Sequence, residues 1–215
     1  MSTTAPHMSA PSPDGDGVRL VTSEQAPEPP AFLIDRARRA LTEEFLNSDP
    51  RLWAALGLCR LIPPLGGNRL RTKLLRLGGM QIGPGTVLGG IVHVHGGPHA
   101  AGRLHIGRRC WINADCTFDS SAEIIIEDDV ALGQQVLILT NTHEIGDPGY
   151  RAGASKELPV RIRSGAWIGA RATILPGVTV GTGTIVAAGA VVAKSTSDNV
   201  LVAGVPARFV KNLPI

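Results

Sequence analysis

One histidine, His143, lies in a polar segment whose residue types could accept a proton and bind a hydroxyl group. Histidine is the side chain best suited to take up a proton near neutral pH, and hydrogen-bonding neighbours can fix which ring nitrogen does so. A lone histidine in a loop is also commonly a solvated side chain without a role, so the surrounding residues determine whether a functional role is plausible. Its polar neighbours are Asn141, Thr142, Glu144, Asp147 and Arg151.

The chain that must position this segment repeats an aliphatic residue every six positions. A six-residue period fits neither a lone amphipathic helix nor an array of hairpins. It indicates a hexapeptide β-helix, in which each repeat forms one side of a triangular coil. Residues three repeats apart, such as Ala170 and Ala188, are then expected one above the other on parallel strands. Near the C-terminus the repeat comprises Ile162, Ile168, Ile174, Val180, Val186 and Val192.

The same repeat predicts where the coil is interrupted. It can be followed from Ile82 onward, with a two-residue slip around residues 120–123. Between Ile138 and Ile162 the regular aliphatic steps disappear, although the phase is kept. We therefore expect a loop at about residues 140–158 that leaves the coil and carries His143.

The N-terminal part of the chain has a different composition. Residues 1–30 are rich in Pro, Ser, Thr and Ala and are expected to form a disordered tail, because they cannot bury enough apolar area to offset the ordering entropy. Residues 31–80 are expected to form a helical cap over the open edge of the coil, and residues 81–215 the β-helix. The helices could also lie against a membrane surface. The basic residues there are Arg69, Arg71, Lys73 and Arg76.

Charge and cysteine content exclude several classes of partner and setting. The formal charge is only +3, and no basic run is interleaved with aromatic residues, so we expect no nucleic-acid partner. Three cysteines are too few for a disulfide framework, and no segment resembles a signal peptide or a membrane span. These features predict a cytoplasmic protein. Packing of coils side by side predicts a closed ring, most simply a homotrimer.

Several short motifs stand out in the loop and in the coil that follows it. They are Asn141-Thr-His143, Asp147-Pro148 with Arg151, Trp167-Ile-Gly-Ala170, Ile174-Leu-Pro-Gly-Val178 and Val202-Ala-Gly-Val-Pro-Ala-Arg208. Together they resemble the hexapeptide-repeat sugar O-acetyltransferases, the family of galactoside, maltose and nodulation acetyltransferases. The resemblance covers roughly residues 66–212. It implies an all-β solenoid, a left-handed parallel β-helix of hexapeptide repeats, that transfers an acetyl group from acetyl-CoA to a sugar hydroxyl without a metal.

The resemblance also implies roles for individual residues. His143 matches the general base, which acts without a covalent enzyme intermediate. Ala170 and Ala188 match small residues that leave a groove open for the pantetheine arm, and a backbone N–H near Ala170 would hold the oxyanion. Acceptor-binding positions are matched by Trp111, Asn113 and Arg151, and basic positions near the CoA phosphates by Lys194, Arg208 and Lys211.

Simpler explanations exist for most of these residues. Asn113 could be a corner residue in a left-handed conformation, and Trp111 could only pack against a neighbouring subunit. Lys194 and Arg208 could be ordinary surface cations, and the two alanines could be small because tight corners demand it.

Acceptor identity is less well defined. The N-terminal helices do not match the cap of the disaccharide-modifying members, which favours the polysaccharide-modifying branch and a glycan or glycan precursor as acceptor. A non-sugar acceptor is an alternative within the enzymes. Outside them, the chain could be an inactive scaffold or a zinc-dependent, carbonic-anhydrase-like protein. The candidate zinc ligands are His93, His95, His99 and His105.

Overall fold

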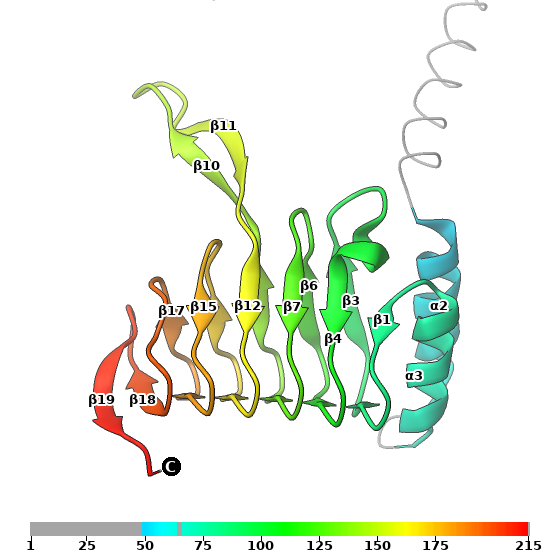
Figure 1. Cartoon of the computed structure of the whole chain (residues 1–215). Helices are drawn as coiled ribbons and strands as arrows, with labels where there is room; N and C mark the ends of the chain where they lie inside the picture. Colours follow the sequence, from blue (N-terminus) through cyan, green and yellow to red (C-terminus); the bar gives the residue numbers. More distant parts are fainter. Residues whose placement is uncertain (1–48, 64–65, 215) are drawn as a thin grey trace, which may run out of the picture. The chain divides into compact units, whose positions relative to one another are not determined.

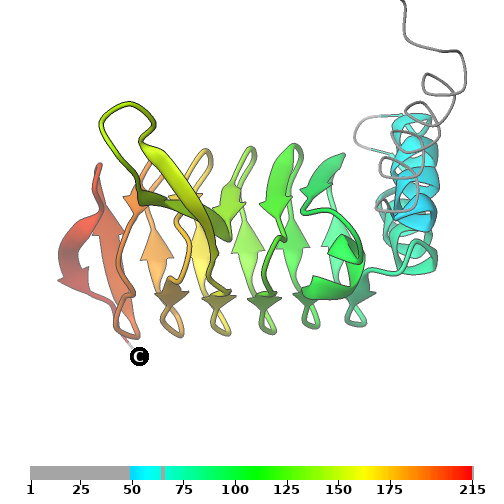
Figure 2. The ribbon, with the colours of Figure 1, turned by 90° about the horizontal axis from the view of Figure 1, so that it is seen from above.

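The structure is a computed structural model that describes residues 49–63 and 66–214. Our prediction of a tail over residues 1–30 and the part of the predicted helical cap before residue 49 lie outside these ranges. From Gln81 onward, short strands from successive turns of the chain stack in parallel into three sheets, which form the sides of a coil (Figures 1 and 2). This is the parallel β-helix that the six-residue repeat predicts.

Each sheet takes one strand from every turn of the coil. Sheet 1 contains β1 (Gln81–Ile82), β4 (Leu104–Ile106), β7 (Ile124–Ile126), β12 (Val160–Ile162) and β15 (Thr179–Val180). Sheet 2 contains β2 (Val87–Leu88), β5 (Trp111–Ile112), β8 (Ala131–Leu132), β13 (Trp167–Ile168), β16 (Ile185–Val186) and β18 (Val200–Ala203), and it ends with the antiparallel β19 (Arg208–Asn212). Sheet 3 contains β3 (Val92–His95), β6 (Cys116–Asp119), β9 (Leu137–Leu139), β14 (Thr173–Ile174) and β17 (Val191–Val192).

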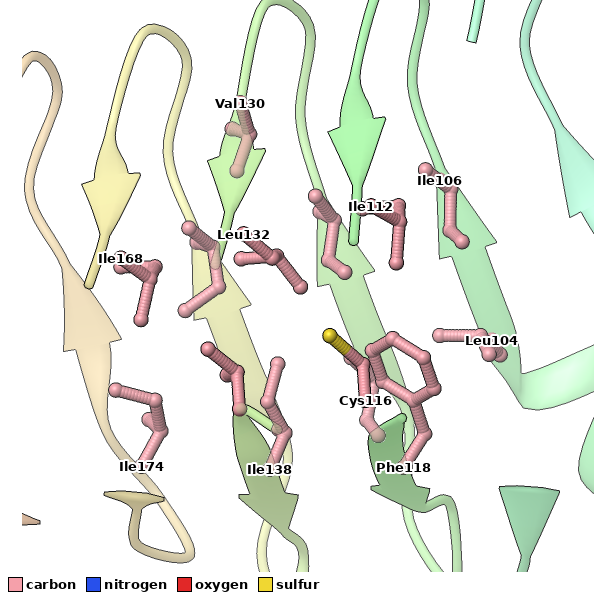
Figure 3. Close-up of a cluster of buried hydrophobic side chains, with 14 of the residues drawn as sticks. Leu104, Ile106, Ile112, Cys116, Phe118, Val130, Leu132, Ile138, Ile168 and Ile174 are labelled. Carbon is pink, nitrogen blue, oxygen red and sulfur yellow. The ribbon is translucent and has the colours of Figure 1, made fainter. Parts of the chain in front are cut away.

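The aliphatic repeat residues fill the interior of the coil (Figure 3). In sheet 2, Ile168 pairs with Val186 in register, 18 residues apart, as the repeat predicts. Corners leave little room, because a Cβ added at Gly169 would lie 2.5 Å from the backbone nitrogen of Ala188. Close stacking of successive turns therefore explains why small residues occupy these corners.

Longer turns of the coil mark its irregular parts. Leu88 and its partner Ile112 are 24 residues apart, and the extra residues form the 3-10 helix η1 (Ala100–Arg103). Ala100, which keeps the aliphatic phase in the sequence, is buried in this helix and does not form a strand. Leu132 and its partner Ile168 are 36 residues apart, twice the regular turn, and there the chain leaves the coil as predicted.

Two helices precede the first strand. α2 (Pro50–Arg60) begins where its sequence predicts, with the Asp49 carboxylate accepting a hydrogen bond from Leu52 N at 3.4 Å. α3 (Asn68–Leu77) packs against α2 and contacts β1 and β2, so it covers the open edge of the first turn. None of the helices in the described residues is long and apolar enough to span a bilayer.

One basic residue of α3 has a different role from the one we expected. Arg71 is buried, and its guanidinium donates hydrogen bonds to the carbonyl oxygens of Ile62, Pro63 and Gly66. It holds together the chain between the two helices and is not available to a lipid or an acidic ligand. Because the face of α3 that carries Arg71 and Leu75 is buried, Leu70 lies on the exposed side of the helix.

The three cysteines are free and buried, Cys59 in α2 and the other two in the coil. Cys110 directly precedes β5 and Cys116 begins β6, and their Sγ atoms donate to the carbonyl oxygens of Glu127 and Gly133 at 3.0 and 3.2 Å. Burial raises the pKa of the Cys116 thiol to about 11 and also raises the pKa values of Cys59 and Cys110. These thiols are therefore protonated and inert near neutral pH.

Replacement of Ile138 by alanine is expected to lower the free energy of unfolding by about 2–5 kcal/mol, because it leaves a cavity between two stacked turns. Leu137→Ala, on the outer side of the same strand, is the matched control and should cost clearly less. Urea denaturation measures both. Equal losses would contradict the assignment of the interior face.

The thiols are expected to resist a chromogenic disulfide reagent at about pH 8 while the protein is folded, and all three should react after denaturation. Ile145→Cys, which places a thiol on an exposed strand, should react at once in the folded protein. Rapid labelling of the native wild-type protein would show that the cysteines are accessible.

The pKa of the Cys116 thiol is higher in the folded than in the unfolded protein. This difference stabilises the folded protein below the unfolded-state pKa, and the contribution is lost as the pH rises through about 11.

Candidate active site

The segment that carries His143, which we predicted as a loop leaving the coil, is a β-hairpin. β10 (Asn141–Ile145) pairs antiparallel with β11 (Ala152–Glu157), and the hairpin extends away from the coil (Figure 1). His143 lies opposite Ser155, and the register shifts between His143 and Ile145. The hairpin strands therefore give a firm backbone to a side chain that is itself exposed.

The imidazole of His143 has a defined tautomer. Its Nδ1 lies 2.9 Å from the carbonyl oxygen of Gly153 on the opposite strand. Because a carbonyl oxygen only accepts, Nδ1 must carry the proton, which leaves the lone pair of Nε2 free to accept one. Gly153 is required at this point, since a Cβ there would lie 2.8 Å from the Glu144 carbonyl oxygen. This is the arrangement that a general base needs.

The base of the hairpin is held by a carboxylate that the sequence analysis did not single out as functional. Oδ2 of Asp119, at the end of β6, accepts from the backbone nitrogen of Asn141 at 3.1 Å. Thr140 Oγ1 donates to the Asp119 carbonyl oxygen at 2.6 Å and accepts from Ala122 N at 2.8 Å. Asp119 therefore fixes the point at which the chain leaves the coil. Its signal in the sequence is the two-residue slip after β6.

A groove on the outer face of sheet 2 brings four of the predicted site residues together. Its volume is about 460 Å3. Trp111 and Trp167 flank the small Ala131 on neighbouring turns, in register, and are 47% and 55% exposed. We did not predict Trp167 as a site residue. Its position in line with Trp111, on the other side of Ala131, identifies it as part of the groove. The predicted site residues in this lining are Trp111, Asn113, Ala170 and Ala188.

The corner next to this groove excludes the explanation that Asn113 is only a corner residue in a left-handed conformation. Asp115, with φ 60°, is the left-handed residue of that corner, and Asn113 is not. Oδ1 of Asn113 accepts from the backbone nitrogen of Ala114 at 2.9 Å, which leaves its amide nitrogen as a donor toward the groove lining. Asn113 is thus a polar group on an otherwise largely apolar surface.

Backbone groups also reach this groove at the corner after β13. The N–H groups of Gly169 and Arg171 donate to carbonyl oxygens of Val186 and Gln134. Between them, the N–H of Ala170 has no hydrogen-bond acceptor among the described residues. An N–H of this kind can donate to an oxygen that gains negative charge during a reaction.

The predicted phosphate-binding cations are only partly brought together. Lys194 and Arg208 line a second pocket of about 400 Å3 at the C-terminal end of the coil, together with Phe209 and the segment 195–197. Lys211 lies further along β19, opposite Leu201, and does not line this pocket.

The residues predicted to bind the acceptor substrate lie in two separate parts of the chain. Trp111 and Asn113 line the groove on sheet 2, whereas Arg151 lies at the hairpin tip, where its guanidinium donates to the Gly146 carbonyl oxygen at 3.3 Å. His143 does not line that groove either. Within one chain, the proton acceptor and the groove are therefore carried by different structural elements.

The histidines of the zinc alternative do not converge. His93 Nε2 lies 3.9 Å from an oxygen of Asp115, while His105 lies between Gln81 and Glu123. His99 adopts a left-handed conformation before η1. Across residues 49–63 and 66–214, no three His, Cys, Asp or Glu side chains are placed to hold a metal ion together.

Known proteins share the repeat and the fold. Residues 159–194 match the family model described as bacterial transferase hexapeptide (six repeats). A putative acetyltransferase of Schizosaccharomyces pombe is 37% identical over 110 residues, which are 51% of this chain and 53% of that protein. The galactoside O-acetyltransferase of Escherichia coli is 31% identical over 110 residues, 51% and 54% of the two chains. This chain thus spans about half the length of the curated relatives it matches.

A solved structure extends the likeness to most of the fold. The hexapeptide-repeat acetyltransferase of Vibrio cholerae, in complex with acetyl coenzyme A, superimposes with a TM-score of 0.63 and 26% identity over 76% of this chain and 88% of that one. The repeat and this fold fit a left-handed coil. Part of this chain thus matches the hexapeptide-repeat model, and its fold is similar to that of a hexapeptide-repeat acetyltransferase.

Proposed function

We propose that this protein transfers an acetyl group from acetyl-CoA to a hydroxyl group of a sugar. The observation that carries the proposal is the groove on sheet 2, which gathers Trp111, Asn113, Ala170 and Ala188 from three turns of the coil. An aromatic face suits the apolar side of a sugar ring, and small side chains leave room for an extended thioester arm. The relatives named for galactoside acetylation and for an acetyl-CoA complex support the same chemistry.

In this mechanism His143 Nε2 removes the proton from the sugar hydroxyl as its oxygen attacks the thioester carbonyl carbon. The carbonyl oxygen becomes an oxyanion, to which the free N–H of Ala170 donates. When the carbon–sulfur bond breaks, the electron pair leaves with sulfur, and the imidazolium returns its proton to the thiolate. No enzyme nucleophile is needed, and the buried, protonated cysteines agree with direct transfer.

We further propose that the working form is a homotrimer in which His143 of one subunit serves the groove of its neighbour. Trp111 and Trp167, which are exposed, form an outward apolar row on sheet 2 with the half-buried Ile185. This row supports packing of a second copy there, since contiguous apolar surface is uncommon on monomers. The acceptor we propose is a cytoplasmic glycan or glycan precursor. A non-sugar acceptor would require a different fit for the aromatic pair.

Replacement of His143 by alanine is expected to lower kcat by about 10²–10⁴-fold, because the hydroxyl would keep its proton during attack. Release of CoA thiol in the presence of a panel of glycans measures the rate. His105→Ala, a histidine on another sheet, is the control and should leave the rate unchanged. Turnover of His143→Ala within a few-fold of wild type would remove the general-base assignment.

Arg208→Gln is expected to raise KM for acetyl-CoA by about tenfold, the loss of one charge-assisted hydrogen bond to phosphate. Acetyl-pantetheine lacks the nucleotide phosphates, so its KM should not change in the same variant. Steady-state kinetics with both donors checks this. A similar rise for both donors would place Arg208 outside the phosphate site.

A further inference from the structure

The outward face of α2 is apolar, although the helix already buries its other face. Leu52, Ala55 and Cys59 face the protein interior. The residues at relative positions 0, 3, 4, 7, 8 and 11 lie on one opposite side of a helix and form what we call the α2 stripe. Its large members are well exposed, at 57% for Trp53, 49% for Leu58 and 79% for Leu61. The stripe comprises Pro50, Trp53, Ala54, Gly57, Leu58 and Leu61, all of them exposed.

Cations border the α2 stripe on both long edges. Seven residues make nearly two full helical turns, so Arg51 lies on the same edge as Leu58 and Arg60 on the same edge as Trp53, in each case about two turns apart along the helix. Both arginines are exposed. The charge is not balanced locally, because Asp49 is the one acidic residue between positions 49 and 114.

The neighbouring helix adds surface of the same kind. In α3 the exposed side chains are two leucines, Leu70 and Leu77, and three cations. These cations are Arg69, Lys73 and Arg76, of which Arg76 also donates to the carbonyl oxygens of Ile82 and Gly83.

A recess adjoins the Trp53 and Arg60 edge of the stripe. It has a volume of about 330 Å3 between α2 and β3, and its strand side includes His93 and His95. Guanidinium and imidazole N–H groups suit the oxygens of a phosphate. Two acidic residues lie on the next turn: Asp115, with an oxygen 3.9 Å from His93 Nε2, and Asp119, which is opposite His95 in the sheet.

We propose that the α2 stripe docks on an anionic phospholipid surface, with α2 lying in the plane of the interface. The tryptophan and the leucines enter the apolar boundary, while Arg51 and Arg60 meet headgroup phosphates on either side. A helix of 11 residues lies on a bilayer and does not cross it. A second copy of the chain is a poorer occupant, since two stripes packed face to face would place two arginines, and no acidic residue of α2, along each edge of the contact.

The charge part of the proposal is tested by flotation of the full-length protein with vesicles. We expect binding to vesicles of equal parts phosphatidylcholine and phosphatidylglycerol, and little to phosphatidylcholine alone. Arg51→Gln with Arg60→Gln should weaken binding by about 25-fold, at about fivefold for each cation. Arg161→Gln with Arg163→Gln removes the same charge from sheet 1 and should bind as wild type. Equal weakening in the two double variants would reject a specific surface.

The apolar part is tested by Trp53→Ser, Leu58→Ser and Leu61→Ser combined. All three side chains are exposed, so the urea midpoint should be unchanged while vesicle binding is lost. Val210→Ser, which removes one exposed apolar side chain on β19, should bind as wild type. The proposal is overturned if the triple variant binds normally, if the wild type ignores anionic vesicles, or if sedimentation velocity shows that the triple change dissociates an oligomer. None of these readouts depends on acetyl transfer.

Discussion

The in-register hydrogen bonding between successive turns of the coil is the constraint on which the rest of this structure depends. Each strand contributes as few as two residues, so no strand is stable by itself and each turn relies on its neighbours. Every turn must therefore bring an aliphatic residue to the same place, as Leu132, Ile168 and Val186 do on sheet 2. Chain added to a turn can be accommodated only where it leaves the coil between two strands without changing that phase.

Both halves of the candidate active site follow from this constraint. The hairpin with His143 uses the extra chain between β9 and β12, and the regular turns before and after it keep their register. The groove uses the opposite property, because regular stacking places Trp111, Ala131 and Trp167 in one line on sheet 2. Asp119 connects the two, since it ends a strand of the coil and holds the first residues of the hairpin. The regular coil thus determines where the hairpin that carries His143 begins.

The two ends of the coil face the problem of unpaired strand edges. At the C-terminal end, β19 turns back and pairs antiparallel with β18. At the N-terminal end, α3 contacts the first two strands, and Arg71 is buried to hold the chain between the helices. Covering an edge requires one apolar helix face. α2 has two, and the second face is what leads us to a lipid surface as its partner.

The sequence by itself determined the coil, its phase, the start of α2 at Pro50 and the place where the chain leaves the coil. A six-residue period and a helix cap are local patterns, and the structure that they predict does not depend on which other segments pack against them. The sequence also pointed to His143, because it lies in the one long interruption. It did not predict that this interruption would be a paired hairpin, since its aliphatic content is low.

Only the tertiary structure decided which outward side chains share a surface. Turns of 24, 20, 36 and 18 residues separate stacked partners on sheet 2, so Trp111 and Trp167 become neighbours across a distance that no fixed spacing reveals. The same holds for Arg71, which is buried among carbonyl oxygens, and for Lys211, which lies apart from Lys194 and Arg208. The physical reason is that the six-residue phase alone determines which side chains face the interior of the coil. Which side chains lie next to one another on its outer surface depends also on the length of every turn between them.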